Sequence, residues 1–288
     1  METVPSLYNY ATEEEVALAE RINATMYRYD NPATNHIDSL ANVTETDIAD
    51  FWKQGYMVVD NVFNQEEVNT SLEAIMDIIM ERVKGPQLQF VKPRDQLKND
   101  FEKELAIRKI ERFVEHDPRL HHLAYHEGMM QLLSSLFTDT PKLVQQQGIL
   151  KPPHGGAEKP WHQDMAYGNL TYEKPVIGVW IALDPAGADN GCMHVIPRSH
   201  MEGPVPHYAV RDWQVCDTSV RVEQDVIVPL APGGVLIFHG MTLHGTPPNF
   251  SEKRRRSLQF HYAPETAVKM SPKEYKRWFT NEMTKAEC

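Results

Sequence analysis

The chain has 288 residues, of which 41% are hydrophobic, and its 29 basic and 40 acidic side chains give a formal charge of −11. This acidic balance disfavours a non-specific nucleic-acid binder, which needs a basic surface, and the absence of any run of 18 apolar residues predicts no membrane-spanning helix. The N-terminus lacks the basic and apolar stretches of a secretory signal, so we expect a cytoplasmic protein. Three cysteines, Cys192, Cys216 and Cys288, show no paired spacing, so we expect no disulfide framework.

The first third of the chain is polar at its start and then carries helix signals. Residues 1–44 are predicted to form an N-terminal arm, with a short helix over Glu13–Thr25. Thr44 is a typical N-cap residue for a helix that ends at Gly55, and residues 56–59 are typical of a strand.

Two further helices and two loops are predicted beyond this point. Apolar residues at helical period predict a helix over residues 65–84, and residues 117–136 form a second helical region with Pro118 at its first position. The charged, proline-containing segment 85–104 is predicted to be a loop or lid, and so is segment 203–222.

After residue 141 the pattern changes to short β-rich runs separated by turn residues. The clearest runs cover residues 176–183, 226–230, 233–239 and 257–262. Helices followed by strands predict an α+β, mainly β fold, with a double-stranded β-helix (jelly-roll, cupin-like) core and N-terminal helices packed on one sheet. We expect one jelly-roll domain over residues 45–265 and a C-terminal helical tail over residues 266–288.

The most informative short motif is His162-Gln163-Asp164. Residues i and i+2 of an extended segment point to the same side, so this imidazole and this carboxylate can bind one metal ion. A third ligand would complete the two-His-one-carboxylate set of non-haem iron oxygenases, which leaves coordination positions open. His239 and His244 are both available for that role in the block of residues 237–249.

A second motif is the basic run Lys253-Arg254-Arg255-Arg256, which follows this block. Arg255 stands at the start of a predicted strand, and a planar guanidinium binds a carboxylate bidentately. An iron oxygenase needs such an anchor for an organic co-substrate. Strand alternation places Ser257, Gln259 and His261 on the same face as Arg255.

These residues make the chain resemble the phytanoyl-CoA dioxygenase family of Fe(II)- and 2-oxoglutarate-dependent oxygenases. The resemblance covers roughly residues 45–265. It is carried by Lys151-Pro152-Pro153, Trp161-His162-Gln163-Asp164, Val179-Trp180-Ile181-Ala182-Leu183, the block from Asn190 to His200, and His244-Gly245-Thr246 with Asn249, Ser251 and Arg255. One departure is Arg198, where many members have glycine.

The resemblance implies a role for each matching position. Iron ligands are implied at His162, Asp164 and His244, which favours His244 over His239. Contacts to 2-oxoglutarate are implied at Arg255, Thr246, Trp180, Gln147 and Lys109. Substrate contacts are expected at Gln145, Tyr167, Gln259 and Trp213. In a strand, Gln145 and Gln147 lie on one face and Gln146 lies on the other.

The function that the resemblance implies is a 2-oxoglutarate-dependent dioxygenase that uses Fe(II), 2-oxoglutarate and O2. We expect it to hydroxylate, or otherwise oxidise, an unactivated C–H bond of a small organic molecule, such as a natural-product intermediate, with release of succinate and CO2. The Asp164 carboxylate disfavours halogenation, because halogenating relatives have a small residue there. The alternatives are an acyl-CoA hydroxylase of lipid metabolism and a non-catalytic metal-binding jelly-roll protein. A small-molecule substrate, no nucleic acid, no membrane and a possible homodimer complete the expectations.

Overall fold

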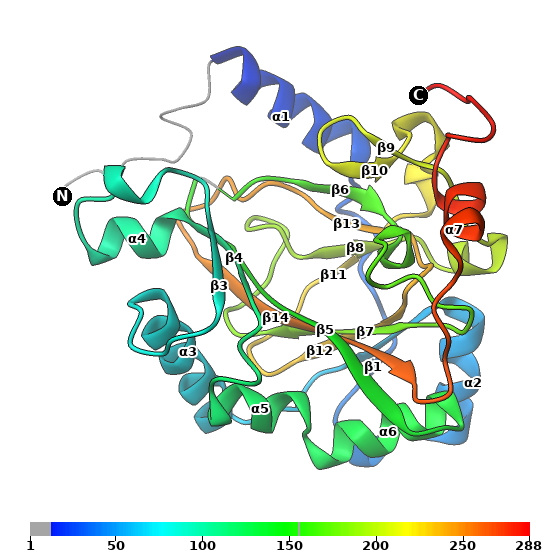
Figure 1. Cartoon of the computed structure of the whole chain (residues 1–288), viewed down its shortest axis with the longest axis horizontal. Helices are drawn as coiled ribbons and strands as arrows, with labels where there is room; N and C mark the ends of the chain where they lie inside the picture. The colour runs from blue at the N-terminus through cyan, green and yellow to red at the C-terminus, as the bar shows by residue number, and fades with distance from the viewer. Residues whose placement is uncertain (1–12, 155) are drawn as a thin grey trace.

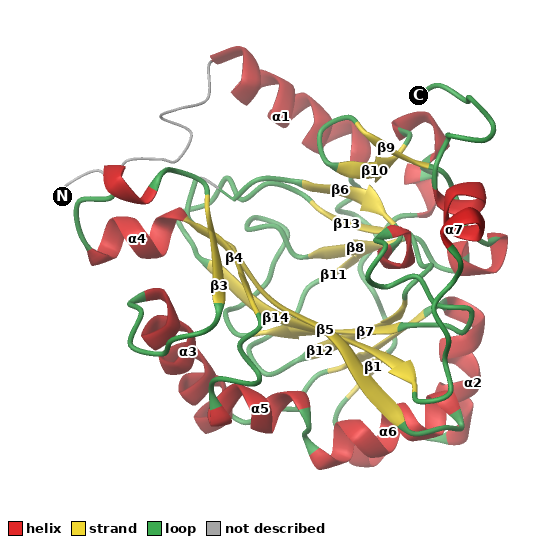
Figure 2. Ribbon diagram, viewed as in Figure 1, coloured by secondary structure: helices red, strands yellow, loops and turns green. Residues whose placement is uncertain are grey.

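The computed structural model of the chain describes residues 13–154 and 156–288, so the first twelve residues of the predicted arm lie outside the described part. Two β-sheets face one another, as Figures 1 and 2 show. The larger sheet has the order β1-β2-β12-β7-β14-β5-β4-β3, and the smaller sheet has the order β11-β8-β13-β6. This arrangement confirms the predicted jelly-roll core.

The strands of the larger sheet are β1 (His36–Ile37), β2 (Tyr56–Val59), β3 (Gln87–Phe90), β4 (Ile107–Glu111), β5 (Pro141–Lys151), β7 (Ile177–Ala182), β12 (Val235–His239) and β14 (Arg255–Pro264). Those of the smaller sheet are β6 (Lys159–His162), β8 (Met193–Val195), β11 (Val226–Val228) and β13 (His244–Thr246). A separate hairpin consists of β9 (His207–Ala209) and β10 (Trp213–Val215). The four predicted β runs are therefore confirmed.

Helices cover the outer face of the larger sheet (Figure 2). They are α2 (Glu45–Gln54), α3 (Gln65–Ile79), α5 (Pro118–Ala124) and α6 (Glu127–Phe137). Alternation along β7 divides its side chains between two cores. Val179 joins the helix-covered core, whereas Trp180 lies in the core between the sheets. The predicted packing of helices on one sheet is confirmed.

The N-terminal helix signals are confirmed by the structure. Helix α1 (Glu13–Met26) coincides with the predicted short helix. Thr44 caps α2 in a reciprocal capping box with Asp47, and Gly55 ends this helix in the left-handed conformation. Helix α3 ends at Ile79, before the predicted end, because Met80 leaves helical geometry.

Three predictions about local structure were wrong. Segment 203–222 is not a plain loop, because it contains the β9–β10 hairpin and a 3-10 turn at Asp217–Ser219. Segment 85–104 is not a plain loop, because it contains β3, a 3-10 turn at Arg94–Gln96 and α4 (Asp100–Ala106). Leu88 and Phe90 pack on the core while Gln87 and Gln89 are exposed, so this short amphipathic strand pairs with β4 at the sheet edge. The single helix predicted over residues 117–136 is two helices, α5 and α6.

The C-terminal segment holds α7 (Pro272–Phe279), which packs beside the β9–β10 hairpin in Figure 1. Beyond it, Cys288 forms a disulfide with Cys216, so two of the three cysteines are paired where the sequence spacing predicted no disulfide framework. The two cysteines are 72 residues apart, and only the fold brings their Cα atoms to 5.3 Å. Among residues 13–154 and 156–288, no helix is both long and apolar enough to cross a membrane.

Candidate metal centre and co-substrate pocket

Three side chains converge between the two sheets at the end of β6. His162 is the last residue of β6, and Asp164 opens the short 3-10 turn Asp164–Ala166. The intervening Gln163 is extended, so the expected same-side placement of the two ligands holds. His244 begins β13 directly opposite His162. The Nε2 atoms of His162 and His244 lie 3.3 Å and 3.5 Å from Oδ1 of Asp164.

Backbone carbonyls orient both imidazoles. Nδ1 of His162 lies 2.7 Å from the carbonyl oxygen of Pro160, and Nδ1 of His244 lies 2.8 Å from that of Thr242. A ring that donates from Nδ1 presents the lone pair of Nε2 to its other side. Burial, together with the neighbouring His244, lowers the pKa of His162 to about 4, so this ring is neutral at physiological pH. Neutral imidazole is the form that binds a metal ion.

The two oxygen atoms of Asp164 have different neighbours. Oδ1 faces the two Nε2 atoms, while Oδ2 accepts a hydrogen bond of 3.1 Å from Gln259 and lies 2.6 Å from Nε2 of His261. Burial opposes ionisation here, but the nearby His244 and His261 hold the pKa of this carboxyl well below its usual value. The carboxylate is therefore charged and has one oxygen free to coordinate a cation.

A divalent transition metal fits this group of residues. The ligand atoms of His162, Asp164 and His244 all lie within 4.8 Å of one another, and all three residues are buried. Nε2 of His244 is buried without a hydrogen-bond partner, which is costly unless a ligand satisfies it. His239 belongs neither to this group nor to the lining of the adjoining cavity, and its Nδ1 accepts a hydrogen bond of 3.0 Å from the backbone of Met241.

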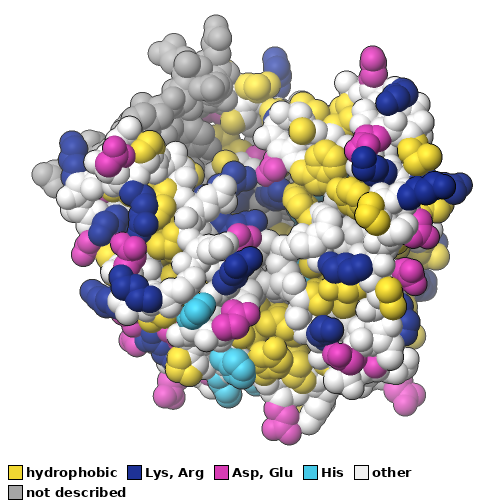
Figure 3. Space-filling model, in the orientation of Figure 1, with side chains coloured by type: hydrophobic (Ala, Val, Ile, Leu, Met, Phe, Trp, Pro, Cys, Tyr) yellow, Lys and Arg dark blue, Asp and Glu magenta, His cyan; other side chains and the backbone are white. Residues whose placement is uncertain are grey.

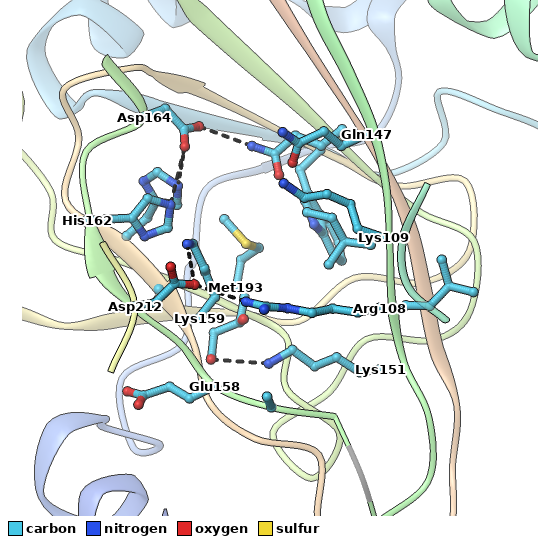
Figure 4. A pocket seen from close by; sticks show the side chains of 18 of the residues that line it. Arg108, Lys109, Gln147, Lys151, Glu158, Lys159, His162, Asp164, Met193 and Asp212 are labelled. Atoms are coloured by element: carbon cyan, nitrogen blue, oxygen red, sulfur yellow. Dashed lines mark hydrogen bonds and ion pairs between the residues drawn. The ribbon is translucent and has the colours of Figure 1, made fainter. Parts of the chain in front are cut away.

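The triad lines one end of a cavity of about 390 Å³, shown close up in Figure 4. Arg255, fully buried, lines the same cavity. Its Nη1 donates to Ser257 over 2.7 Å, while Nε and Nη2 have no partner. Burial lowers the pKa of this guanidinium to about 10, so the group still carries its charge at neutral pH. Two unpartnered donors on one buried cation fit a carboxylate ligand.

Most of the predicted contact residues line this cavity together. They are Thr246, Trp180, Gln147, Lys109, Gln145, Tyr167 and Gln259. The Trp180 ring centroid lies 5.5 Å from Cζ of Arg255. Gln146 faces the other way and accepts a hydrogen bond from the backbone of Phe113, so the predicted alternation is confirmed. Trp213 does not line the cavity, because its indole packs outside and donates to the carbonyl of Ala166.

Several lining residues were missed by sequence reasoning. Lys151 is buried, and its Nζ donates to the carbonyls of Thr246, at 3.2 Å, and Pro247. Burial and the nearby Arg255 hold the pKa of Lys151 well below its usual value. The position of Lys151 four residues after Gln147, on the same strand face, was the available signal.

Comparisons with known proteins agree with this geometry. The phytanoyl-CoA dioxygenase family model matches residues 51–257. A probable phytanoyl-CoA dioxygenase of Caenorhabditis elegans is 28% identical over 233 residues, which are 73% of this chain and 72% of the relative.

Two solved structures share the fold. EvdO2 from Micromonospora carbonacea var. aurantiaca complexed with 2-oxoglutarate has 23% identity and a TM-score of 0.63, covering 82% of this chain and 97% of its own. The epimerase SnoN in complex with Fe3+, alpha ketoglutarate and nogalamycin RO has 21% identity and a TM-score of 0.61, covering 79% and 86%. The family match spans most of this chain. The chain thus belongs to the phytanoyl-CoA dioxygenase family and is a dioxygenase dependent on Fe(II) and 2-oxoglutarate.

Proposed function

We propose that His162, Asp164 and His244 hold the Fe(II) ion, and that Arg255 with Thr246 binds the far carboxylate of 2-oxoglutarate. Trp180, Gln147 and Lys109 form the walls of the co-substrate site, and Gln145, Tyr167 and Gln259 face the substrate. Residues 45–265 act as one oxygenase unit between an N-terminal arm and a C-terminal tail.

The observation that carries this assignment is the pairing of two unsatisfied sites in one cavity. Nε2 of His244 lacks a partner at one point, and Nε and Nη2 of Arg255 lack partners at another. A metal ion satisfies the first site and a carboxylate satisfies the second. A 2-oxo acid with a distal carboxylate has a chelating end and an anionic end, so it suits both.

The chemistry supplied by bound iron and 2-oxoglutarate is activation of O2, oxidation of a substrate C–H bond, and release of succinate and CO2. The protein contributes position and solvent exclusion. Asp164 would hold the ion through Oδ1, and a carboxylate at this position favours oxygen transfer over halogenation. Gln259 and His261 hold Oδ2 and keep that oxygen turned away from the metal position. Burial of Arg255 keeps water from competing for its guanidinium.

The substrate that we propose is a small organic molecule of the natural-product type. The fold similarity to EvdO2 and to SnoN, which was solved with nogalamycin RO, supports this class. The cavity volume of about 390 Å³ is near the lower end of the range of about 300–1,000 Å³ that is usual for small-molecule pockets. An acyl-CoA would have to keep most of its bulk outside this cavity.

A spectroscopic experiment tests the iron site. Anaerobic addition of Fe(II) and 2-oxoglutarate should produce a weak visible charge-transfer band, which reports chelation at the metal. His244→Gln should abolish the band. His239→Gln replaces a nearby buried histidine that we exclude as a ligand, so it should keep the band. Loss of the band in His239→Gln alone, or its absence from folded wild-type protein, would contradict the assignment.

Succinate formation tests the substrate class. The wild-type protein is supplied with 2-oxoglutarate, O2 and a panel of terpenoids, polyketides, amino acids and acyl-CoAs. We expect substrate-dependent succinate with a small free molecule. Succinate with acyl-CoAs alone would favour the acyl-CoA hydroxylase alternative.

A further inference from the structure

The outer wall of the cavity carries two cations that share one carboxylate. Arg108 comes from β4 in the larger sheet, and Lys159 begins β6 in the smaller sheet. Asp212 lies in the turn of the β9–β10 hairpin. Its Oδ2 is 3.0 Å from Nη2 of Arg108 and 2.7 Å from Nζ of Lys159. Figure 4 shows the three side chains meeting beside the cavity, which all three line.

The charges on this wall do not balance. Burial opposes ionisation of Asp212, but Lys159 holds the pKa of this carboxyl at about 2, so it contributes one full negative charge. Arg108 and Lys159 contribute two positive charges against it. Lys109 does not change the sum, because its Nζ lies 3.4 Å from the carboxylate of Glu111.

The remaining acidic residue of the wall is already engaged elsewhere. Glu158 accepts hydrogen bonds from the Tyr27 hydroxyl at 2.8 Å and from Nε of Arg211 at 2.9 Å. Arg108, Lys159 and Asp212 together thus carry one positive charge in excess, on a chain whose formal charge is −11. Dark-blue Lys and Arg side chains are visible inside the central hollow in Figure 3. A local excess of this kind attracts anions into a cleft.

Partial removal from water strengthens this preference. The Lys159 side chain is 29% exposed, and its Nζ sits 5.0 Å from the centre of the Tyr167 ring. Burial lowers the pKa of this ammonium although Asp212 opposes the shift. A cation that has lost part of its hydration gains from an added anionic partner.

These observations point to the chemistry of the substrate, on the basis of the proposed function above. We propose that Arg108 and Lys159 bind a carboxylate on the prime substrate, which is a small organic acid. Asp212 offers the same group to the same two cations and so occupies this subsite when no substrate is present. The C–H bond to be oxidised then belongs to a molecule tethered by its acid group at the outer wall.

Binding of matched test compounds decides this proposal without turnover. The full-length protein is loaded with Mn(II) and saturated with 2-oxoglutarate, and calorimetry follows addition of phenylacetate, phenylacetamide and benzylamine, then hexanoate, hexanamide and hexylamine. We expect each acid to bind at least about tenfold more tightly than its amide. Equal binding of acids and amides, or tighter binding of the amines, overturns the proposal.

Two variants act in opposite directions on the same subsite. Arg108→Met with Lys159→Met should remove the preference for acids, whereas Asp212→Asn should strengthen acid binding several-fold by removing the internal competitor. Arg82→Met is the matched control, because it breaks an exposed arginine–aspartate pair at the end of α3. Persistence of the acid preference in the double variant, or weaker acid binding in Asp212→Asn, overturns the proposal.

The failure of this subsite is distinguishable from failure of the proposed function. The charge-transfer band with Fe(II) and 2-oxoglutarate depends on the triad and on Arg255. If the band forms but acids show no preference, the subsite is wrong and the oxygenase assignment stands. If the band never forms, the oxygenase assignment itself fails.

Discussion

The contacts of Asp164 determine which of its two carboxylate oxygens can bind a metal ion. Its Oδ1 faces the two histidines, and Gln259 and His261 hold its Oδ2. This division leaves one oxygen for a metal ion and prevents the carboxylate from turning. Groups that orient a ligand in this way commonly contribute as much to a metal site as the ligands themselves.

His261→Phe removes one of these restraints. We expect metal affinity to fall by about ten- to a hundredfold, because the carboxylate is no longer held in a single orientation. Titration with Mn(II), followed by calorimetry, measures the change. Tyr262→Phe is the control on the opposite face of the same strand, where it loses a hydrogen bond to Ala124 but should keep full metal affinity. Unchanged affinity in His261→Phe would show that Gln259 alone fixes the carboxylate.

For single residues, the sequence predicted which face of the strand a side chain lies on, but not which residue it contacts. Alternation from Arg255 placed Gln259 and His261 inward, and both do point between the sheets. Gln259 was expected to contact substrate, yet in the structure it also donates to Asp164. That contact joins residues 95 positions apart, and no local pattern encodes the distance between β14 and the end of β6.

At the scale of elements, Gly55 connects helix α2 to the segment that precedes His244, the third residue of the candidate metal site. Its φ of +84° ends the helix, and its carbonyl accepts hydrogen bonds from the backbone of His239 and the hydroxyl of Thr242. A Cβ at this position would lie 2.4 Å from Nδ1 of His200. The glycine is therefore required both by its backbone conformation and by lack of space.

Gly55→Ala should destabilise the protein by at least about 2 kcal/mol, because strain at positive φ adds to the clash. Chemical denaturation measures the loss of unfolding free energy. Gly168→Ala is the matched control, since an added Cβ there meets no atom within 4 Å. A difference between the two variants below about 0.5 kcal/mol, the usual scatter of surface substitutions, would contradict this account.

Elements with clear end signals were predicted accurately, and those without them were not. Thr44 and Gly55 mark both ends of α2, whose bounds match the expectation. The break between α5 and α6 falls at His126, whose side chain caps the second helix through the backbone of Met129. Histidine is an uncommon N-cap residue, and the helical spacing of apolar residues continues across it, so the sequence did not predict a helix end there. Strand β3 was not predicted, because it has only four residues and its flanking residues are rich in proline and charge.

At the scale of the whole molecule, the disulfide between Cys216 and Cys288 links two segments that are 72 residues apart in the sequence. Cys216 directly follows β10, and Cys288 lies beyond α7, so the bond ties the tail to the hairpin that carries Asp212. Sequence spacing gave no sign of it, because the partners are brought together by packing of α7 over Met165 and Trp213. Overall topology was predictable from the order of helices and strands, whereas this closure was not.

Cys288→Ser should lower the stability of the oxidised protein. The chain-entropy model for a loop of 72 residues gives an upper value of roughly 4 kcal/mol. Thermal melting with and without dithiothreitol measures the effect. Wild-type protein should respond to the reductant and Cys288→Ser should not. A reductant effect of equal size in both proteins would show that it arises elsewhere.

The buried guanidinium of Arg255 has a consequence for the energy of the ligand-free fold. A charge removed from water with two donors unsatisfied is a frustrated arrangement, and replacing it with an apolar side chain of similar length relieves that frustration. Ser257 would keep a partner after such a change, because its hydroxyl donates to the carbonyl of Ile149.

Arg255→Met should therefore raise the melting temperature of the free protein by a few degrees. Added 2-oxoglutarate should raise the melting temperature of the wild type but not that of the variant. Thermal melts at several co-substrate concentrations compare the two proteins. A lower melting temperature for the free variant would show that Arg255 is a structural cation. The expected result means that the Arg255 site lowers the folding stability of the ligand-free protein, and that the protein reaches its most stable form only with bound 2-oxoglutarate.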